Sequence, residues 1–123
     1  MNYGWLKPGT SQAEYRRVVL HEFGHVLGLL HEHLHTDAAI PWDRERVYEE
    51  YAGPPNYFRR EDVDVNVFQR LDRGLLRESA FDRASIMLYP IPVRLTDGKF
   101  SIGWNRDLSA GDKAFVAKLY PGR

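Results

Sequence analysis

The chain has 123 residues, 43% hydrophobic and 13% aromatic, which predicts one domain with a single core and argues against wholesale disorder. Seventeen basic residues balance seventeen acidic ones, so no net field attracts nucleic acid or anionic lipid. No apolar run approaches the roughly 20 residues of a membrane-spanning helix. We therefore expect neither a nucleic-acid nor a membrane partner. The absence of cysteine excludes disulfides, thiolate metal ligands and a cysteine nucleophile.

The N-terminal part of the sequence predicts a strand and then a long helix. Residues 2–6 carry aromatic and apolar side chains and end at Lys7-Pro8-Gly9, which is typical of a short strand and a turn. Ser11 and Glu14 have the spacing of a capping box, and apolar residues then recur every three or four positions to about residue 30. This pattern predicts a broad buried helix face. Its apolar positions are Val18, Val19, Phe23, Val26, Leu27 and Leu30.

The middle of the chain predicts shorter helices. Residues 41–53 are interpreted as a helix capped by Asp43, with Trp42 and Val47 placed as a hydrophobic staple. Residues 60–66 predict another short helix. Residues 69–84 are charged and aperiodic, so we expect irregular structure there.

The C-terminal part predicts a small hairpin and a last helix. Residues 93–95 and 100–102 alternate in polarity on either side of an Asp97-Gly98 pair, which favours a tight turn because it tolerates positive φ. Ser109 and Asp112 have capping-box spacing ahead of an apolar run that ends before Pro121-Gly122. A helix over residues 109–120 is therefore expected.

The distribution of histidine indicates a metal site. All five histidines fall within fifteen consecutive residues, where even scattering would place fewer than one. They are His21, His25, His31, His33 and His35. We interpret His33 and His35 as solvated loop residues, with a metal role for either as the less favoured alternative.

The spacing of the first three histidines allows them to share one ion. His21 and His25 are four residues apart, so on a helix they lie on one face about one turn apart. His31 would point about 280° around a straight helix from His21, away from the other two. The helix must therefore end or bend between them. Gly28 lies at the right place, because glycine can take the left-handed conformation that ends a helix.

Three neutral imidazoles with a water in the remaining position form the ligand set of a catalytic zinc ion, so Zn²⁺ is the expected cofactor. The ion lowers the pKa of its water to about 7 and polarises a carbonyl. Glu22 projects about 100° around the helix from His21, beside the open position, and we interpret it as the general base for the water. The alternative is a buried helix with incidental imidazoles. It does not explain the polar residues on an apolar face, since each unpaired buried polar group costs about 1–3 kcal/mol.

Two separated motifs resemble those of a peptidase family. The segment from His21 to His31, followed by Glu32, is similar to the zinc signature of the metzincin peptidases of the astacin-like branch. Ser85-Ile86-Met87-Leu88-Tyr89 resembles the Met-turn of that family, with leucine where astacins usually have histidine. Residues 40–43 and 52–56 also resemble bacterial members. The resemblance runs from Arg17 to Tyr120.

The resemblance implies further residue roles. Met87 would form a hydrophobic base under the imidazoles without binding the ion. Tyr89 would supply a phenol near the metal, as a resting ligand or as a hydrogen-bond donor to the oxyanion, with an ordinary core tyrosine as the alternative. Glu32 would be a carboxylate close to the ligands or a structural one, which holds the region together, with a solvated glutamate at the helix end as the alternative.

The resemblance also implies the fold class and the function. It implies an α+β, metzincin-like zincin fold, mainly helical in the part present, with a long active-site helix, a Met-turn, a small hairpin and a C-terminal helix, and with the N-terminal sheet largely absent. Residues 1–123 would form a single, partial catalytic domain of a zinc-dependent endopeptidase that hydrolyses peptide bonds by Glu-activated, zinc-bound water. It would act as a monomer on peptide or protein substrates.

Two further points complete these expectations. Secretion is expected of the full-length protein, although the first six residues have no signal-peptide pattern. The alternative function is a zinc-stabilised, non-catalytic binding module or an inactive peptidase remnant. The presence of Glu22 and Tyr89 favours the enzyme, whereas the missing sheet favours the alternative.

Overall fold

The structure is a computed structural model that describes residues 3–71 and 80–122, and it divides into two compact units. The described residues of the first unit are 3–32, 82–89 and 104–122, and those of the second are 33–71, 80–81 and 90–103. The fold is mainly helical, as expected for the C-terminal helical part of a metzincin. No helix in the described ranges has the length and apolar character needed to span a membrane.

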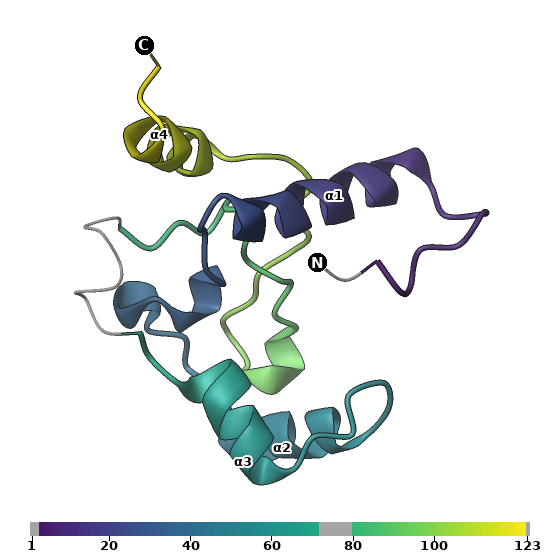
Figure 1. Ribbon diagram of the computed structural model, residues 1–123. Coiled ribbons are helices and arrows are strands. Elements are labelled where there is room, and N and C mark those ends of the chain that lie inside the picture. The colour runs from purple at the N-terminus through teal and green to yellow at the C-terminus, as the bar shows by residue number, and fades with distance from the viewer. Residues whose placement is uncertain (1–2, 72–79, 123) are drawn as a thin grey trace. The chain divides into compact units, whose positions relative to one another are not determined.

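The long helix of the first unit is α1 (Gln12–Val26), shown in purple and blue in Figure 1. The Ser11 hydroxyl accepts the Glu14 N–H at 3.3 Å, which confirms the predicted N-cap. The helix ends about four residues before the periodicity predicts. Leu27 is its C-cap, and Gly28 follows with φ of +92°, a left-handed conformation that glycine adopts without steric cost. The predicted break at Gly28 is confirmed.

The apolar face predicted for this helix is only partly buried. Val18 is buried, but four other apolar positions are exposed: Val19, Phe23, Val26 and Leu30, at 39%, 51%, 56% and 47% of their surface. The prediction of a broad apolar buried face is therefore wrong. The buried positions of α1 are Arg17, Val18, His21, Glu22 and Gly24. Periodicity failed here because the polar side chains of Arg17 and His21, which have hydrogen-bond partners, take part of the inward face.

The C-terminal helix is α4 (Ala110–Leu119), drawn in yellow in Figure 1. Its capping box is formed as predicted, with the Ser109 hydroxyl accepting the Asp112 N–H at 2.9 Å and the Asp112 carboxylate accepting the Ser109 N–H at 2.9 Å. The core of this unit centres on buried Leu29, Ile86 and Met87. Side chains that pack against it are Leu20, Leu27, Leu108, Phe115 and Val116. The core thus joins α1, the loop around Met87 and α4.

The second unit contains α2 (Arg44–Ala52) and α3 (Arg60–Val63), which continues as a π-helical turn, η3 (Asp64–Phe68). These elements confirm the two predicted helices, and the Asp43 side chain caps α2 by accepting the Arg46 N–H at 3.3 Å. Their core is Val47, Val63, Val67 and Leu95, with Trp42 packed against it as the staple predicts. Short 3₁₀ turns complete the described chain: η1 (Glu32–Leu34), η2 (Thr36–Ala38) and η4 (Val93–Leu95).

The predicted hairpin is wrong in its strands and right in its turn. Residues 93–95 form η4, and antiparallel pairing occurs instead at the isolated bridges Ile91–Ile102 and Trp42–Thr96. Gly98 has φ of +86°, and the Asp97 carboxylate accepts the N–H groups of Lys99 and Phe100, two and three positions further along the chain. The turn chemistry is local and could be predicted, whereas the pairing depends on distant residues.

The predicted strand at residues 2–6 is also not formed in its described part. Leu6 N–H donates to the Tyr3 carbonyl at 3.0 Å, which closes a turn. Among residues 3–71 and 80–122, this segment takes part in no strand and no β-bridge. Part of the segment predicted to be irregular, residues 72–79, lies outside the described residues; positions 69–71 and 80–84 carry no helix or strand, as predicted.

Candidate metal centre

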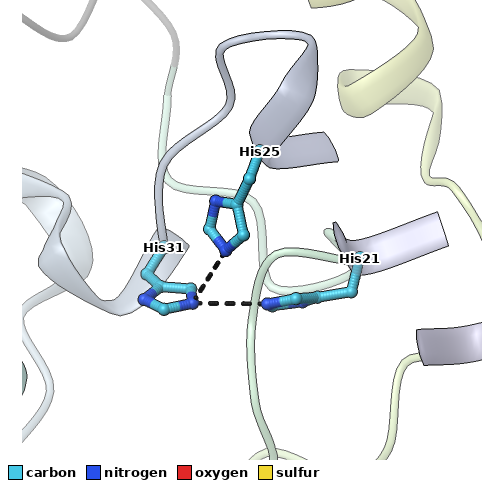
Figure 2. A group of neighbouring side chains, drawn as sticks. All are labelled: His21, His25 and His31. Carbon is cyan, nitrogen blue, oxygen red and sulfur yellow. Dashed lines mark hydrogen bonds between the residues drawn. The ribbon is translucent and has the colours of Figure 1, made fainter. Parts of the chain in front are cut away.

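The three histidines with metal-ligand spacing meet at one point of the first unit. His21 and His25 project from successive turns of α1, and His31 returns to them after the break at Gly28 (Figure 2). The Nε2 atom of His31 lies 3.3 Å from Nε2 of His21 and 3.1 Å from Nε2 of His25. The sequence prediction that a glycine-mediated bend would bring the third imidazole back to the first two is therefore confirmed in its geometry.

Backbone carbonyls determine which nitrogen of two rings carries the proton. His21 Nδ1 donates to the Ile86 carbonyl at 2.8 Å, and His25 Nδ1 donates to the Leu29 carbonyl at 3.0 Å. A carbonyl oxygen can only accept, so both Nδ1 atoms are protonated, and in the neutral rings the Nε2 lone pairs are free. Both lone pairs face Nε2 of His31. One N–H cannot serve both of them, so this arrangement suits a shared cation.

The nitrogen positions fit a tetrahedral metal ion. With metal–nitrogen distances of about 2.0–2.1 Å, two nitrogens on a tetrahedral zinc ion lie about 3.3 Å apart. The separations of 3.3 and 3.1 Å agree with this value, and all three ligand atoms lie within 4.8 Å of one another. The site can therefore hold a metal ion with small movement of the side chains.

Burial keeps one ligand in the neutral form that metal binding requires. His21 is 2% exposed, and this desolvation lowers the pKa of its imidazole below the ordinary value. The hydrogen bond to the Ile86 carbonyl and the charge of Glu22 oppose that effect, while the neighbouring His25 adds to it. Because burial is the largest cause, His21 is uncharged at neutral pH and its Nε2 lone pair is available.

Met87 lies against the helix that carries the first two histidines. Met87 is fully buried, and a Cβ built at Gly24 would overlap its sulfur and lie 3.3 Å from its methyl carbon. The Met87 carbonyl accepts the Glu32 N–H at 3.1 Å, directly after the third histidine. The turn therefore packs under α1 and is also bonded to the chain beside His31. Gly24 was not singled out from the sequence, although it stands between two ligand positions.

The two residues expected to be catalytic lie close to the histidines. Glu22 is 5% exposed on α1, next to His21. The Tyr89 ring lies 4.6 Å from the His21 ring and 5.4 Å from the His31 ring, measured between centroids. Glu32, whose side chain accepts the Asp82 N–H at 2.7 Å, supports the segment that precedes the Met-turn. The expected support role of Glu32 therefore has a structural basis.

The remaining histidines do not join the group. His33 Nε2 donates to the Asn66 carbonyl at 2.8 Å, and burial is the main cause that lowers the pKa of its imidazole. His35 is 3% exposed, and its Nδ1 accepts the Asp37 N–H at 3.0 Å, which caps η2. Both belong to the second unit, and within the described residues the metal-ligand group contains neither. The prediction that His33 and His35 are solvated loop residues is therefore wrong.

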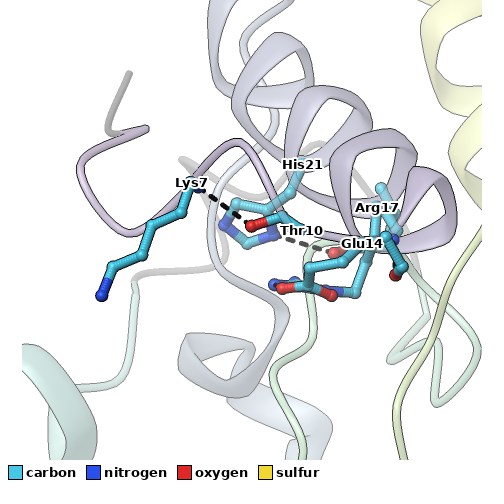
Figure 3. Close-up of polar contacts among 7 residues, drawn as sticks. Lys7, Thr10, Glu14, Arg17 and His21 are labelled. Carbon is cyan, nitrogen blue, oxygen red and sulfur yellow. Dashed lines mark hydrogen bonds and ion pairs between the residues drawn. The ribbon is translucent and has the colours of Figure 1, made fainter.

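An ion pair precedes the ligands along α1. The Arg17 guanidinium donates to both oxygens of Glu14, at 2.8 and 2.7 Å, and lies 4.6 Å from the centre of the Trp104 ring. Figure 3 shows Glu14, Arg17 and His21 along this helix. Arg17 is 4% exposed, so the pair satisfies a buried charge on the helix that carries His21 and His25. Sequence reasoning missed this pair because periodicity places a charged residue on the solvent side.

Comparisons with known proteins show which family this chain resembles. No family model matches the chain. Two solved structures of myroilysin, an astacin-family metallopeptidase, are 49% and 48% identical to it, with TM-scores of 0.93 and 0.63. They cover 100% and 99% of this chain, which spans 60% and 53% of theirs. Tolloid-like protein 1 of Homo sapiens and of Mus musculus is 33% identical over 112 residues, which cover 84% of this chain and 11% of each relative.

The chain therefore belongs to the astacin-like metzincins and corresponds to the C-terminal part of their catalytic domain.

Proposed function

We propose that residues 1–123 form part of the catalytic domain of a zinc-dependent endopeptidase. The observation that carries this proposal is the convergence of three Nε2 atoms, from His21, His25 and His31, at separations that suit a tetrahedral ion. The buried carboxylate of Glu22 directly beside one of these ligands adds a group that a purely structural zinc site does not need.

The donor set favours zinc over harder cations. Imidazole nitrogen is a ligand that zinc prefers, whereas magnesium and calcium select oxygen donors. Zinc bound at these nitrogens would supply the Lewis acidity that lowers the pKa of a coordinated water to about 7 and polarises a peptide carbonyl.

Each nearby side chain would then have its own role in the reaction. Glu22 would take a proton from the attacking water on its carboxylate and pass it to the leaving amine nitrogen. The Tyr89 hydroxyl would donate a hydrogen bond to the oxyanion formed from the carbonyl oxygen. His21 and His25 would stay oriented by their Nδ1 hydrogen bonds to the Ile86 and Leu29 carbonyls, which leaves their Nε2 atoms directed at the metal.

The family membership supports the substrate class and the location. An astacin-like peptidase implies peptide or protein substrates, and we propose that the complete protein acts outside the cell as a monomer. The chain spans only part of its relatives, so these statements concern the whole protein to which it corresponds.

Hydrolysis of a general protein substrate tests the proposal. The zinc-loaded chain is incubated with casein or gelatin, with and without a chelator, beside the variant Glu22→Gln. We expect cleavage that the chelator abolishes and that Glu22→Gln loses, while the variant retains its zinc. Glu49→Gln, at an exposed position of α2, is the matched control and should behave as the wild type.

Two outcomes would contradict the assignment. Undiminished turnover in Glu22→Gln would remove Glu22 from the role of general base. Zinc binding without any cleavage by the wild type would support the alternative, a zinc-stabilised binding module or an inactive remnant.

A further inference from the structure

A continuous row of hydrogen bonds leads from the metal ligand His21 to a carboxylate on another helix. His21 Nδ1 donates to the carbonyl oxygen of Ile86 at 2.8 Å. The same peptide group carries the N–H of Met87, which donates to the Ser85 hydroxyl oxygen at 3.0 Å. The Ser85 hydroxyl in turn donates to Oδ1 of Asp112 at 2.6 Å. Every donor in this row points away from the metal site and towards Asp112.

The row is sealed from solvent at its far end. Ser85, Ile86, Met87 and Asp112 are 1%, 2%, 0% and 4% exposed. A hydrogen bond in such a low-dielectric setting is electrostatically stronger than one in water, and successive bonds polarise one another. The charge on Asp112 is therefore felt along the row instead of being screened.

The two oxygens of the Asp112 carboxylate have different partners. Oδ1 accepts from Ser85, while Oδ2 accepts the N–H of Ile86 at 2.8 Å and the N–H of Ser109 at 2.9 Å. All three contacts use the carboxylate oxygens as acceptors. Among residues 3–71 and 80–122, no lysine or arginine forms an ion pair with it. In that part of the chain its polar partners are these hydrogen-bond donors.

We propose that Asp112 is a positioning residue of the metal centre, whose charge is relayed through Ser85 and the Ile86–Met87 peptide to His21. The relay holds His21 in the tautomer with a proton on Nδ1, and it strengthens Nε2 as a metal ligand. A ligating histidine commonly donates its second N–H to a carboxylate or a carbonyl, which orients the ring and raises its basicity. Here a carbonyl makes the contact and a buried carboxylate polarises it.

The second ligand on α1 provides an internal reference. His25 Nδ1 donates to the Leu29 carbonyl, and the Leu29 N–H returns to the Gly24 carbonyl at 2.9 Å within the same turn. Within the described residues, no carboxylate takes part in this pair of hydrogen bonds. A change at Asp112 should therefore affect His21 and leave His25 as it was.

The cap of α4 gives the competing, purely structural explanation of Asp112. Capping uses Oδ2 together with the Asp112 N–H, which donates to the Ser109 hydroxyl, whereas the relay uses Oδ1. In Asp112→Asn the amide oxygen can take the place of Oδ2, and the NH₂ group takes the place of Oδ1. The side chain then donates to the Ser85 hydroxyl instead of accepting from it. Ser85→Ala interrupts the relay and leaves the cap intact. Ser109→Ala weakens the cap and leaves the relay intact, so it is the matched control.

The test measures two quantities on the full chain. The first is the ¹⁵N chemical shifts of the imidazole nitrogens without metal, and the second is the zinc affinity, by competition with a chromophoric chelator. We expect Asp112→Asn and Ser85→Ala to shift the His21 nitrogens, not those of His25, and to weaken zinc binding by about 10-fold or more. The double variant should change little beyond either single variant, because both interrupt one relay. Ser109→Ala should lower the melting temperature and leave the His21 signals and the zinc affinity unchanged.

Several results would overturn the relay. They are unshifted His21 nitrogens in Ser85→Ala, additive shifts in the double variant, or an equal shift in Ser109→Ala. If Asp112→Asn does not fold, Ser85→Ala decides alone, since it retains the capping carboxylate. The zinc arm rests on the proposed function: a wild type that binds no zinc would contradict that function, while the NMR shifts of His21 would still decide the relay.

Discussion

Met87 occupies the space that a side chain at Gly24 would need. A Cβ at Gly24 would overlap the buried sulfur of Met87. The turn around Met87 therefore lies closer to α1 than a residue with a side chain at position 24 would allow. The close packing of α1 on the turn around Met87 therefore depends on this one glycine.

Gly24→Ala should therefore lower stability even though alanine is the better helix former. The helix preference alone would favour alanine by about 1 kcal/mol. Overpacking a buried contact costs about 1–3 kcal/mol, and Met87 has no solvent into which it can move, so we expect net destabilisation of about 1 kcal/mol. Denaturant unfolding measures the difference. Gly9→Ala, where a Cβ meets nothing within 4 Å, is the control; a Gly24→Ala variant as stable as this control would contradict the packing argument.

Gly28→Ala should disturb the return of His31 to the other ligands. Gly28 has φ of +92°, a conformation that costs an L-residue about 1–2 kcal/mol, although nothing obstructs the added atom. We expect a loss of stability of that size and weaker zinc binding, measured by thermal unfolding and chelator competition. Gly103→Ala, with no positive φ and open space around it, should be neutral in both measurements. Equal behaviour of the two variants would show that the left-handed turn is dispensable.

Tyr89→Phe should reduce turnover and leave the metal in place. The substitution keeps the ring next to His21 and removes only the hydroxyl proposed to stabilise the oxyanion. Loss of one such donor costs about 10²-fold or more in kcat, so we expect this fall with little change in KM or zinc affinity. Tyr57→Phe, at a residue that is 71% exposed, controls for the loss of a phenol. A kcat equal to that of the control would assign Tyr89 to packing alone, and a loss of zinc would make it a ligand.

The ion pair of Glu14 with Arg17 predicts sensitivity to acid. The hydrogen bond from Arg17 is the main cause that lowers the pKa of Glu14 below its ordinary value of 4.5. As the pH falls, Glu14 is therefore protonated in the unfolded chain before it is protonated in the folded chain. The stabilisation is present above pH 4.5 and is lost as the pH falls through the lowered pKa. At neutral pH the Glu14→Gln variant should be less stable than the wild type by about 1–2 kcal/mol. Below pH 4.5 it should lose less stability on acidification than the wild type does. Parallel pH profiles of melting temperature for variant and wild type would refute this assignment.

The parts of this protein that the sequence could predict are those controlled by residues close together in the chain. Ser11, Asp43 and Ser109 cap their helices as expected, because capping involves residues three positions apart. The bend that brings His31 to His21 was predictable because one glycine provides it.

The parts that escaped prediction depend on distant contacts. The expected strands around Asp97 did not form, since their pairing is decided by residues outside the turn. Asp112 could be recognised as a cap, but its bond to Ser85 joins positions 27 residues apart. Val19 and Phe23 were expected inside because apolar spacing alone does not show which side chains have buried partners.

The most direct test of the central claim is the zinc content of the purified 123-residue chain after dialysis, measured by elemental analysis for the wild type, His25→Ala and His31→Ala. The shared site of three imidazoles predicts one zinc ion per wild-type chain and a clear loss of zinc in both variants, with helical content retained in circular dichroism. A wild type without zinc, or either variant with a full complement, would contradict it.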